Sequence, residues 1–331
     1  MVSSRRHHRY RPTVGVAAES AVDRRQFGRL AVGSLMAFAM SGCSPDAASS
    51  GRLEKVWGRL GISDGRFQKP RAMAIDARDH LYIVDMTARI QVFDGEGNFL
   101  RVWNTPEHAH GKPTGLTIAP DGILLVADTH YYRVLSYTPD GELLTDLTLG
   151  GTMGQGPGEF GLVTDAVRDA EGNYYVAEYG EYDRVQKFSP DREFILQWGG
   201  HGSEPGKFVR PQNLEMDREG HLWVADACNH RIQVFDSEGK LLTMWGTPGS
   251  APGELRYPYD LAFGGEGHVY VCEYGNNRVQ KFTLDGKSIA CWGTGGRQPG
   301  QLFNPWALVY DSQGRLDVLD SNNHRVERIV M

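Results

Sequence analysis

Long apolar runs and basic residues are both scarce in this chain of 331 residues. No stretch reaches the 18 apolar residues that a membrane-spanning helix needs, which excludes an integral membrane domain built from helices. Beyond position 42 the chain holds 28 Lys and Arg against 39 Asp and Glu, a net charge of −11. An acidic body repels a phosphate backbone, so we expect no nucleic-acid partner.

The N-terminus has the features of an export signal. Residues 24–43 read RRQFGRLAVGSLMAFAMSGC, in which paired arginines precede a short apolar run. This order is typical of a twin-arginine signal peptide. Small residues before Cys43 resemble a bacterial lipoprotein cleavage site, with Cys43 as the acylated residue. An ordinary cleaved signal with an incidental cysteine is the alternative.

These features divide the chain into three parts. We predict a signal peptide at 1–43, a polar tether at 44–51 and a folded body at 52–331. The signal places the protein in the cell envelope or periplasm, where its lipid is the one contact with the membrane.

Cysteine is rare as well, with four in the whole chain. Cys228, Cys272 and Cys291 have no metal-cluster spacing. One strand would separate Cys272 from Cys291 by about 10 Å, too far for a disulfide. A Cys228–Cys272 bridge between neighbouring repeats stays open. The odd count in an exported chain indicates unpaired, mostly buried thiols.

A repeated unit with spacings of 43–50 residues dominates the rest of the sequence. In each copy an acidic residue ends a short apolar strand, and an arginine follows four to six residues later. The acids are Asp85, Asp128, Glu178, Asp226, Glu273 and Asp320, and the arginines are Arg89, Arg133, Arg184, Arg231, Arg278 and Arg325. Because they recur in every copy, we interpret them as structural braces of one loop.

Each copy predicts four short strands. In the fourth copy we expect strands at 213–216, 222–225, 231–235 and 241–245, joined by Asp-x-x-Gly turns. Trp-Gly pairs close most copies, and a loop rich in Gly and Pro leads to the next copy. We expect the tryptophans to pack between neighbouring copies.

The phase of the repeat predicts how the ring closes. Trp57-Gly58 has no three strands before it, and the last copy ends after its third strand at 325–329. Residues 52–57 should therefore be the missing outer strand of the last blade. The predicted fold is an all-β, six-bladed β-propeller of four-stranded blades, closed by this N-terminal strand.

The repeat resembles the NHL family over residues 52–331. The resemblance rests on Pro-x-x-Leu or Ile at the inner strand, on VADACNHRIQVF at 224–235 and on the closing Trp-Gly. It implies a six-bladed propeller, and it leaves the function open because this fold hosts many roles.

Positions at which the copies disagree are the candidate site. The inner strands begin at the channel mouth with a mixed ring of side chains: Arg71, Thr114, Thr164, Gln212, Tyr259 and Trp306. The next ring is Ala72, Gly115, Asp165, Asn213, Asp260 and Ala307. From these we select Arg71, Thr114, Asp165, Gln212, Asn213, Tyr259, Asp260 and Trp306 as the hypothetical ligand-binding residues. A water-filled channel that binds nothing is the alternative.

An enzyme of the peptidyl-hydroxyglycine lyase type is the competing function. In that family three blades place a His directly after the inner-strand Pro, and the three imidazoles hold zinc. The six matching positions here contain neither His nor Cys. His108 and His110 share one loop, and two ligands on one loop make a weak metal site. We therefore disfavour the lyase, and we expect no catalytic residue, metal or cofactor.

The sequence thus predicts a monomeric binding or scaffold protein of the cell envelope. Its channel-mouth face would meet a peptide, a glycan or a protein partner.

Overall fold

The computed structural model describes residues 50–331. The predicted signal peptide, Cys43 and most of the tether lie outside the described residues, so those expectations stay predictions. Within the described part, no helix has the length and apolar character that would let it cross a membrane.

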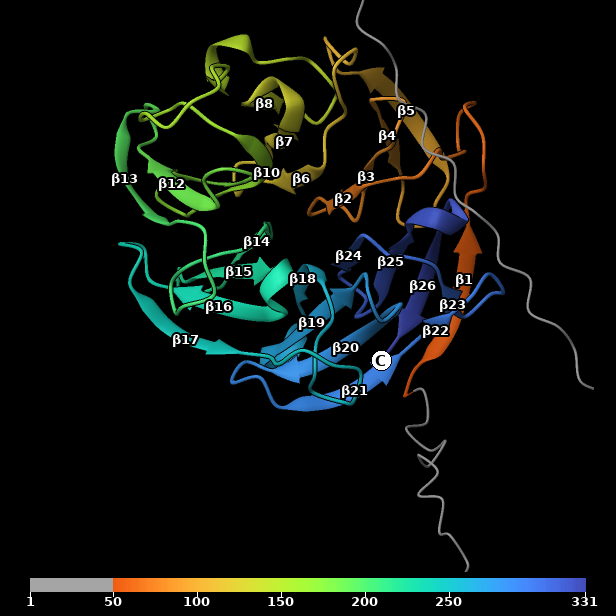
Figure 1. The fold of residues 1–331 in the computed structure, drawn as a ribbon. Helices are drawn as coiled ribbons and strands as arrows, with labels where there is room; N and C mark the ends of the chain where they lie inside the picture. The colour runs from red at the N-terminus through yellow and green to blue at the C-terminus, as the bar shows by residue number, and fades with distance from the viewer. Residues whose placement is uncertain (1–49) are drawn as a thin grey trace, which may run out of the picture. The chain divides into compact units, whose positions relative to one another are not determined.

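The described chain forms six four-stranded antiparallel sheets arranged as a β-propeller, which confirms the predicted fold class (Figure 1). Their strands are β2 (Ala72–Ile75), β3 (Leu81–Val84), β4 (Arg89–Phe93) and β5 (Phe99–Asn104); β6 (Gly115–Ile118), β7 (Leu124–Asp128), β8 (Arg133–Tyr137) and β9 (Leu149–Gly150); β10 (Leu162–Arg168), β11 (Tyr174–Tyr179), β12 (Arg184–Phe188) and β13 (Phe194–Gly199); β14 (Pro211–Met216), β15 (Leu222–Asp226), β16 (Arg231–Phe235) and β17 (Leu241–Trp245); β18 (Pro258–Phe263), β19 (His268–Glu273), β20 (Arg278–Thr283) and β21 (Ser288–Trp292); and β24 (Ala307–Tyr310), β25 (Leu316–Asp320), β26 (Arg325–Val330) and β1 (Arg52–Trp57). We number these blades 1 to 6 in this order.

Short elements join the blades and their strands. Three single-turn 3₁₀ helices fill the loop between the second and third strands, and each ends on a residue in the left-handed conformation. The short helices are η1 (Thr129–Tyr131), η2 (Thr145–Leu147), η3 (Ala227–Asn229), η4 (Gly265–Gly267) and η5 (Ser321–Asn323), and β22 (Thr294–Gly295) pairs with β23 (Gln301–Leu302) in the loop before blade 6. The predicted strands of blade 4 agree within one residue, except that β14 begins two residues earlier.

Blade 6 closes the ring by pairing the two ends of the described chain. Strand β1 lies antiparallel to β26, from Arg52 opposite Val330 to Trp57 opposite Val326, with an irregularity after Leu53. The sheet order β1-β26-β25-β24 places this N-terminal strand on the outside of the last blade. The closure predicted from the phase of the repeat is therefore confirmed.

The hydrophobic core is divided into six clusters, each shared by two neighbouring blades. Tryptophans contribute to these clusters as predicted: the Trp245 ring of blade 4 lies 4.7 Å from the Phe282 ring of blade 5. Gly286 in the next blade makes room for this tryptophan, since a Cβ there would come within 2.4 Å of the indole, and its φ of +84° also favours glycine.

Arginine braces hold each blade to the loop that enters it. In all six blades the repeated acid and arginine form an ion pair, with N–O distances of 2.5–3.1 Å. In blade 4 Arg231 also donates to the carbonyls of Ser203, Glu204 and Lys207 in the preceding loop. The brace thus reaches further than the single loop predicted from the sequence, and charge-assisted bonds of this kind are strong.

Removing β1 tests the closure. We expect a chain that begins at Gly58 to have a lower melting temperature than one that begins at Ser50, and to self-associate, because β26 becomes a free edge and the Trp57 contacts are lost. Thermal denaturation and light scattering of the two chains measure this. Equal melting temperatures and monomeric behaviour in both would show that the ring does not depend on β1.

Candidate ligand site at the channel mouth

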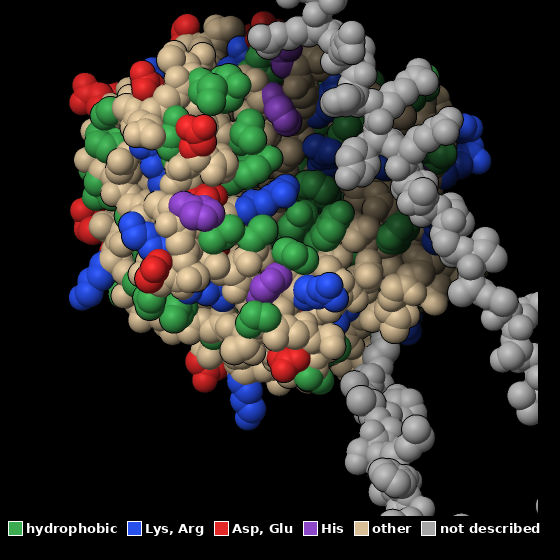
Figure 2. Space-filling model, viewed as in Figure 1, with side chains coloured by type: hydrophobic (Ala, Val, Ile, Leu, Met, Phe, Trp, Pro, Cys, Tyr) green, Lys and Arg blue, Asp and Glu red, His purple; other side chains and the backbone are tan. Residues whose placement is uncertain are grey.

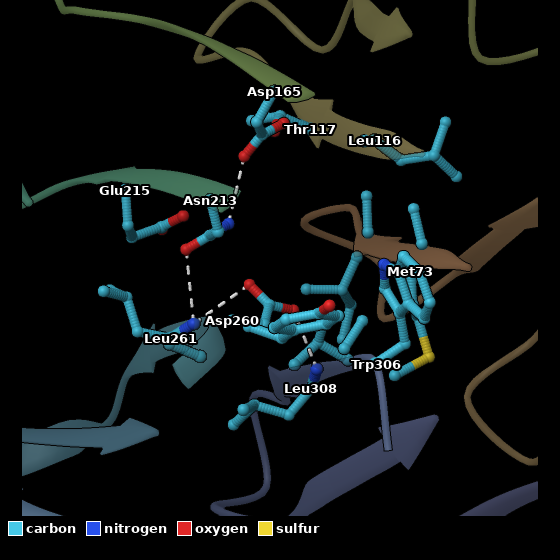
Figure 3. Close-up of a pocket in the computed structure, with 18 of the residues that line it drawn as sticks. Met73, Leu116, Thr117, Asp165, Asn213, Glu215, Asp260, Leu261, Trp306 and Leu308 are labelled. Atoms are coloured by element: carbon cyan, nitrogen blue, oxygen red, sulfur yellow. Dashed lines mark hydrogen bonds between the residues drawn. The ribbon is translucent and has the colours of Figure 1, made fainter. Parts of the chain in front are cut away.

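The eight predicted site residues line a single cavity at the axis of the propeller, together with Ala72, Gly115 and Ala307. Figure 3 labels Asp165, Asn213, Asp260 and Trp306 among them. The inner strands β2, β6, β10, β14, β18 and β24 surround this axis (Figure 1). The volume of the cavity is about 180 Å³. Thr164 belongs to the same repeat position but does not line the cavity, because its Oγ1 donates to the carbonyl of Pro211 at 2.7 Å. The structure thus gathers these residues in one place, and ligand binding by them stays a prediction.

An aromatic cluster forms one side of the mouth. The Tyr259 and Tyr274 rings stack with centroids 4.4 Å apart, and the Trp306 ring meets Tyr259 edge-on at 5.0 Å. Tyr274 comes from the loop after β19, where the copy reads Glu-Tyr-Gly instead of Asp-x-x. Tyr259 is buried under this stack, whereas Tyr274 and Trp306 are partly exposed, so these two rings offer the surface on which a ligand can pack.

Two arginines lie among these rings. The Cζ of Arg71 is 5.2 Å from the Trp306 ring centroid, and the Cζ of Arg210 is 4.8 Å from the Tyr179 centroid and 5.6 Å from the Tyr259 centroid. Burial and the nearby charge of Arg210 lower the pKa of Arg71. Figure 2 shows hydrophobic and Lys or Arg side chains around the centre of the face turned to the viewer.

Carboxylate and amide oxygens in the next ring connect neighbouring blades. Asp165 Oδ2 accepts from the backbone N–H of Leu214 at 3.0 Å, and Asp260 Oδ2 accepts from that of Leu308 at 2.9 Å. Asn213 donates to Asp165 at 3.0 Å and accepts from the N–H of Leu261 at 3.2 Å (Figure 3). These oxygens therefore satisfy backbone donors that the next inner strand turns toward the channel.

Close approach of blades 2 and 3 explains Gly115. A Cβ at this position would come within 2.3 Å of the Thr164 carbonyl oxygen and 2.8 Å of Asp165 Oδ1. Glycine at this ring position thus serves packing between the blades.

Sequence reasoning missed Glu215 and Arg210. Glu215 lies two residues after Asn213 on β14 and lines the cavity beside Asp165 and Asp260. It is the one acid at its repeat position, so the disagreement between copies was a signal in the sequence. Arg210 comes from the loop before β14, and its place over Tyr179 and Tyr259 depends on the folded loops.

Burial raises the pKa of all three carboxyl groups in the channel. Desolvation is the largest cause in each case. The pKa of Asp165 is raised to about 7 and that of Glu215 to about 8, where the charge of Asp165 adds to the effect. The pKa of Asp260 is also raised well above its ordinary value, and the charges of Asp165 and Glu215 contribute.

The ring does not suit the zinc site of a peptidyl-hydroxyglycine lyase. At the six positions that follow the inner-strand proline or its equivalent, no imidazole faces the channel. Across residues 50–331, no three His, Cys, Asp or Glu side chains are grouped so as to hold a metal ion. His108 and His110 are exposed, and the His110 ring packs on Tyr131 at 5.9 Å.

The three cysteines of the described chain are unpaired, as predicted, and the open alternative of a Cys228–Cys272 bridge is not realised. Cys272 is buried, whereas Cys228 and Cys291 are only partly buried.

Comparisons with known proteins agree with this architecture. Residues 208–235 and 255–282 match the model of the NHL repeat. "NHL repeat-containing protein 3" of Mus musculus is 31% identical over 173 residues, which are 48% of this chain and 49% of that protein. Two segments of the chain thus match the NHL repeat, in agreement with the resemblance predicted from the sequence. The chain spans about half the length of this relative.

Two further similarities concern proteins with enzyme names. "Peptidyl-glycine alpha-amidating monooxygenase B" of Xenopus laevis is 37% identical over 138 residues, covering 39% of this chain and 15% of that protein. Among solved structures, a streptogramin B lyase superposes with a TM-score of 0.59 at 13% identity, covering 83% of this chain and 96% of that one. An identity this low indicates a shared fold and nothing about activity.

The substitution Glu215→Gln tests the charge crowding in the channel. A folded-state pKa raised to about 8 means that the folded protein holds this proton more tightly than the unfolded chain does. The stability that the protonated Glu215 carboxyl gives to the folded state is fully present below the unfolded pKa and is lost as pH rises toward 8. We expect E215Q to match the parent protein at roughly pH 4 and to exceed its unfolding free energy by several kcal/mol, up to about 5 kcal/mol, at roughly pH 8.5, since each pKa unit corresponds to about 1.4 kcal/mol.

Denaturant unfolding at both pH values measures this difference, and Glu193→Gln, at an exposed position, is the matched control. A pH-independent difference for E215Q would contradict the raised pKa.

Proposed function

We propose that this protein is a binding protein of the cell envelope that holds a protein or peptide partner at the channel mouth. The observation that carries the proposal is the cluster of Tyr259, Tyr274 and Trp306 beside Arg71 and Arg210. Aromatic and arginine side chains are the residue types that most often anchor a partner. The likeness to NHL-repeat propellers supports a protein partner in general.

The location is part of the same proposal. The twin-arginine motif at Arg24-Arg25 would export the chain, and an acylated Cys43 would tether it to a membrane by its lipid. The acidic body disfavours a nucleic-acid partner, as argued from the sequence. We further propose that the protein is a monomer and that a glycan is the second choice of partner.

An enzyme is the second candidate, because a stretch of this chain is 37% identical to an amidating monooxygenase. The ring of Arg71, Thr114, Thr164, Gln212, Tyr259 and Trp306 argues against a three-histidine zinc site. A stoichiometric zinc or iron in protein purified from its host would favour this candidate.

Partner capture tests the mouth. We expect the double variant Tyr259→Ala and Trp306→Ala to lose most capture of a cross-linked envelope partner, at least tenfold, because the stacked surface disappears. The matched control is Leu242→Ala with Met244→Ala, two exposed apolar residues of the outer strand β17. Unchanged capture by the mouth variant would refute the proposed face.

Cell fractionation tests the proposed export and lipid anchoring. We expect Cys43→Ser to move the protein from the membrane fraction to the soluble envelope fraction, because the acyl attachment site is gone. Replacing both Arg24 and Arg25 with Lys should instead hold the chain in the cytoplasm. Membrane association of the Cys43→Ser protein after a salt wash would contradict a lipid anchor.

A further inference from the structure

The two halves of the channel differ in their hydrogen-bonding groups. On the wall built by blades 3, 4 and 5, Asp165, Asn213 and Asp260 supply oxygens that accept backbone N–H groups of the next inner strand. In blades 6 and 1 the same repeat position holds Ala307 and Ala72. A methyl group cannot accept a hydrogen bond, so these two blades offer nothing to the strand that follows.

Within residues 50–331, two backbone donors of this kind therefore have no side-chain acceptor. The N–H groups of Leu214, Leu261 and Leu308 all turn toward the channel, where side-chain oxygens accept them. Met73 and Leu116 hold the same repeat position in blades 1 and 2, and both line the cavity. By the register of the repeat their N–H groups face the same way, toward an alanine of the preceding blade.

Two side-chain donors add to the same wall. Among residues 50–331 the Arg71 guanidinium, which lines the cavity, has no carboxylate partner, and it lies over Trp306. The Trp306 Nε1 is buried and has no hydrogen-bond acceptor. Four outer-strand tryptophans share this lack, but Trp306 is the one whose side chain lines the cavity (Figure 3). All four donors thus belong to residues that line the cavity on the side of blades 6, 1 and 2.

The opposite wall presents acceptors. Glu215, Asp165 and Asp260 all line the cavity there. Asp165 and Asp260 are engaged by backbone N–H groups, whereas within the described chain the Glu215 carboxyl has no hydrogen-bond or ion-pair partner. A donor group of positive charge would relieve the crowding of these three carboxyls.

We propose that the channel binds a small zwitterion of the free amino-acid type, with its carboxylate on Arg71, Trp306 and the Met73 and Leu116 N–H groups and its ammonium toward Glu215 and Asp260. This inference rests on the proposed function, since the molecule enters through the same mouth. The volume of about 180 Å³ suits a small molecule, because it lies below the roughly 300–1,000 Å³ of sites for drug-sized ligands.

Amino acids and their blocked derivatives test the two charges separately. Binding of the standard amino acids to the purified protein is screened by thermal shift and measured by titration calorimetry. For the tightest binder, we expect the C-terminal amide and the N-acetyl derivative each to bind at least tenfold more weakly. A short peptide that ends in this residue carries an amide in place of the ammonium and should resemble the N-acetyl form.

Variants assign each charge to its wall. Arg71→Gln should weaken binding of the free amino acid about tenfold. It should leave the weak binding of the amide unchanged, because the amide has no carboxylate to pair with Arg71. Glu215→Gln should also weaken binding of the free amino acid about tenfold, and it should leave binding of the N-acetyl form unchanged, because that form has no ammonium group. Ala307→Asp copies Asp260 into blade 6, where its carboxylate would accept the Met73 N–H and repel the ligand carboxylate.

The outcomes separate this inference from the proposed function. Failure of every amino acid to bind, or binding of the amide or N-acetyl form as tight as that of the free amino acid, overturns the zwitterion site. Partner capture that still depends on Tyr259 and Trp306 would then leave the proposed mouth standing. If Ala307→Asp does not fold, the paired effects of Arg71→Gln and Glu215→Gln still decide the matter.

Discussion

The pairing of β1 with β26 is the constraint on which the rest of the molecule depends. Each of the six hydrophobic clusters is shared by two blades, so none is complete unless both neighbours are in place. The cluster between blades 6 and 1 includes Phe67 and Phe93 together with Leu319 and Val326, and Trp57 of β1 packs against it. Because β1 supplies the outer edge of blade 6, the ends of the chain hold the ring together.

Closure also creates the candidate site. The cavity has walls from all six inner strands, and the half with the alanines joins blades 6 and 1, which come from opposite ends of the described chain. Asp165 and Asp260 show how structure and site share residues, since each carboxylate ties two blades together and also faces the cavity. Ala72 and Ala307 provide no such bond, and the residues that precede them, Arg71 and Trp306, contact each other instead.

The fold could be predicted from the sequence because its signals are local and repeated. The acid–arginine pair recurs in all six copies and the Trp-Gly pair in most of them, and together with the phase of Trp57 they report the strand positions. The roles of the site residues could not be read in the same way. Asp165 and Asn213 were candidates for ligand contact, but their bonds to Leu214 and Leu261 arise only when neighbouring blades meet. Arg210 was missed because a loop carries it across the mouth to Tyr179.

The seam in blade 6 also has a mechanical consequence. Arg52 lies opposite Val330, so the two ends of the described chain leave the seam at the same end. Tension applied between those ends loads the hydrogen bonds one at a time, as in a zipper, instead of shearing them all together. Thermal unfolding must break many contacts together, whereas a small force applied between the two ends of the described chain can open the seam one hydrogen bond at a time.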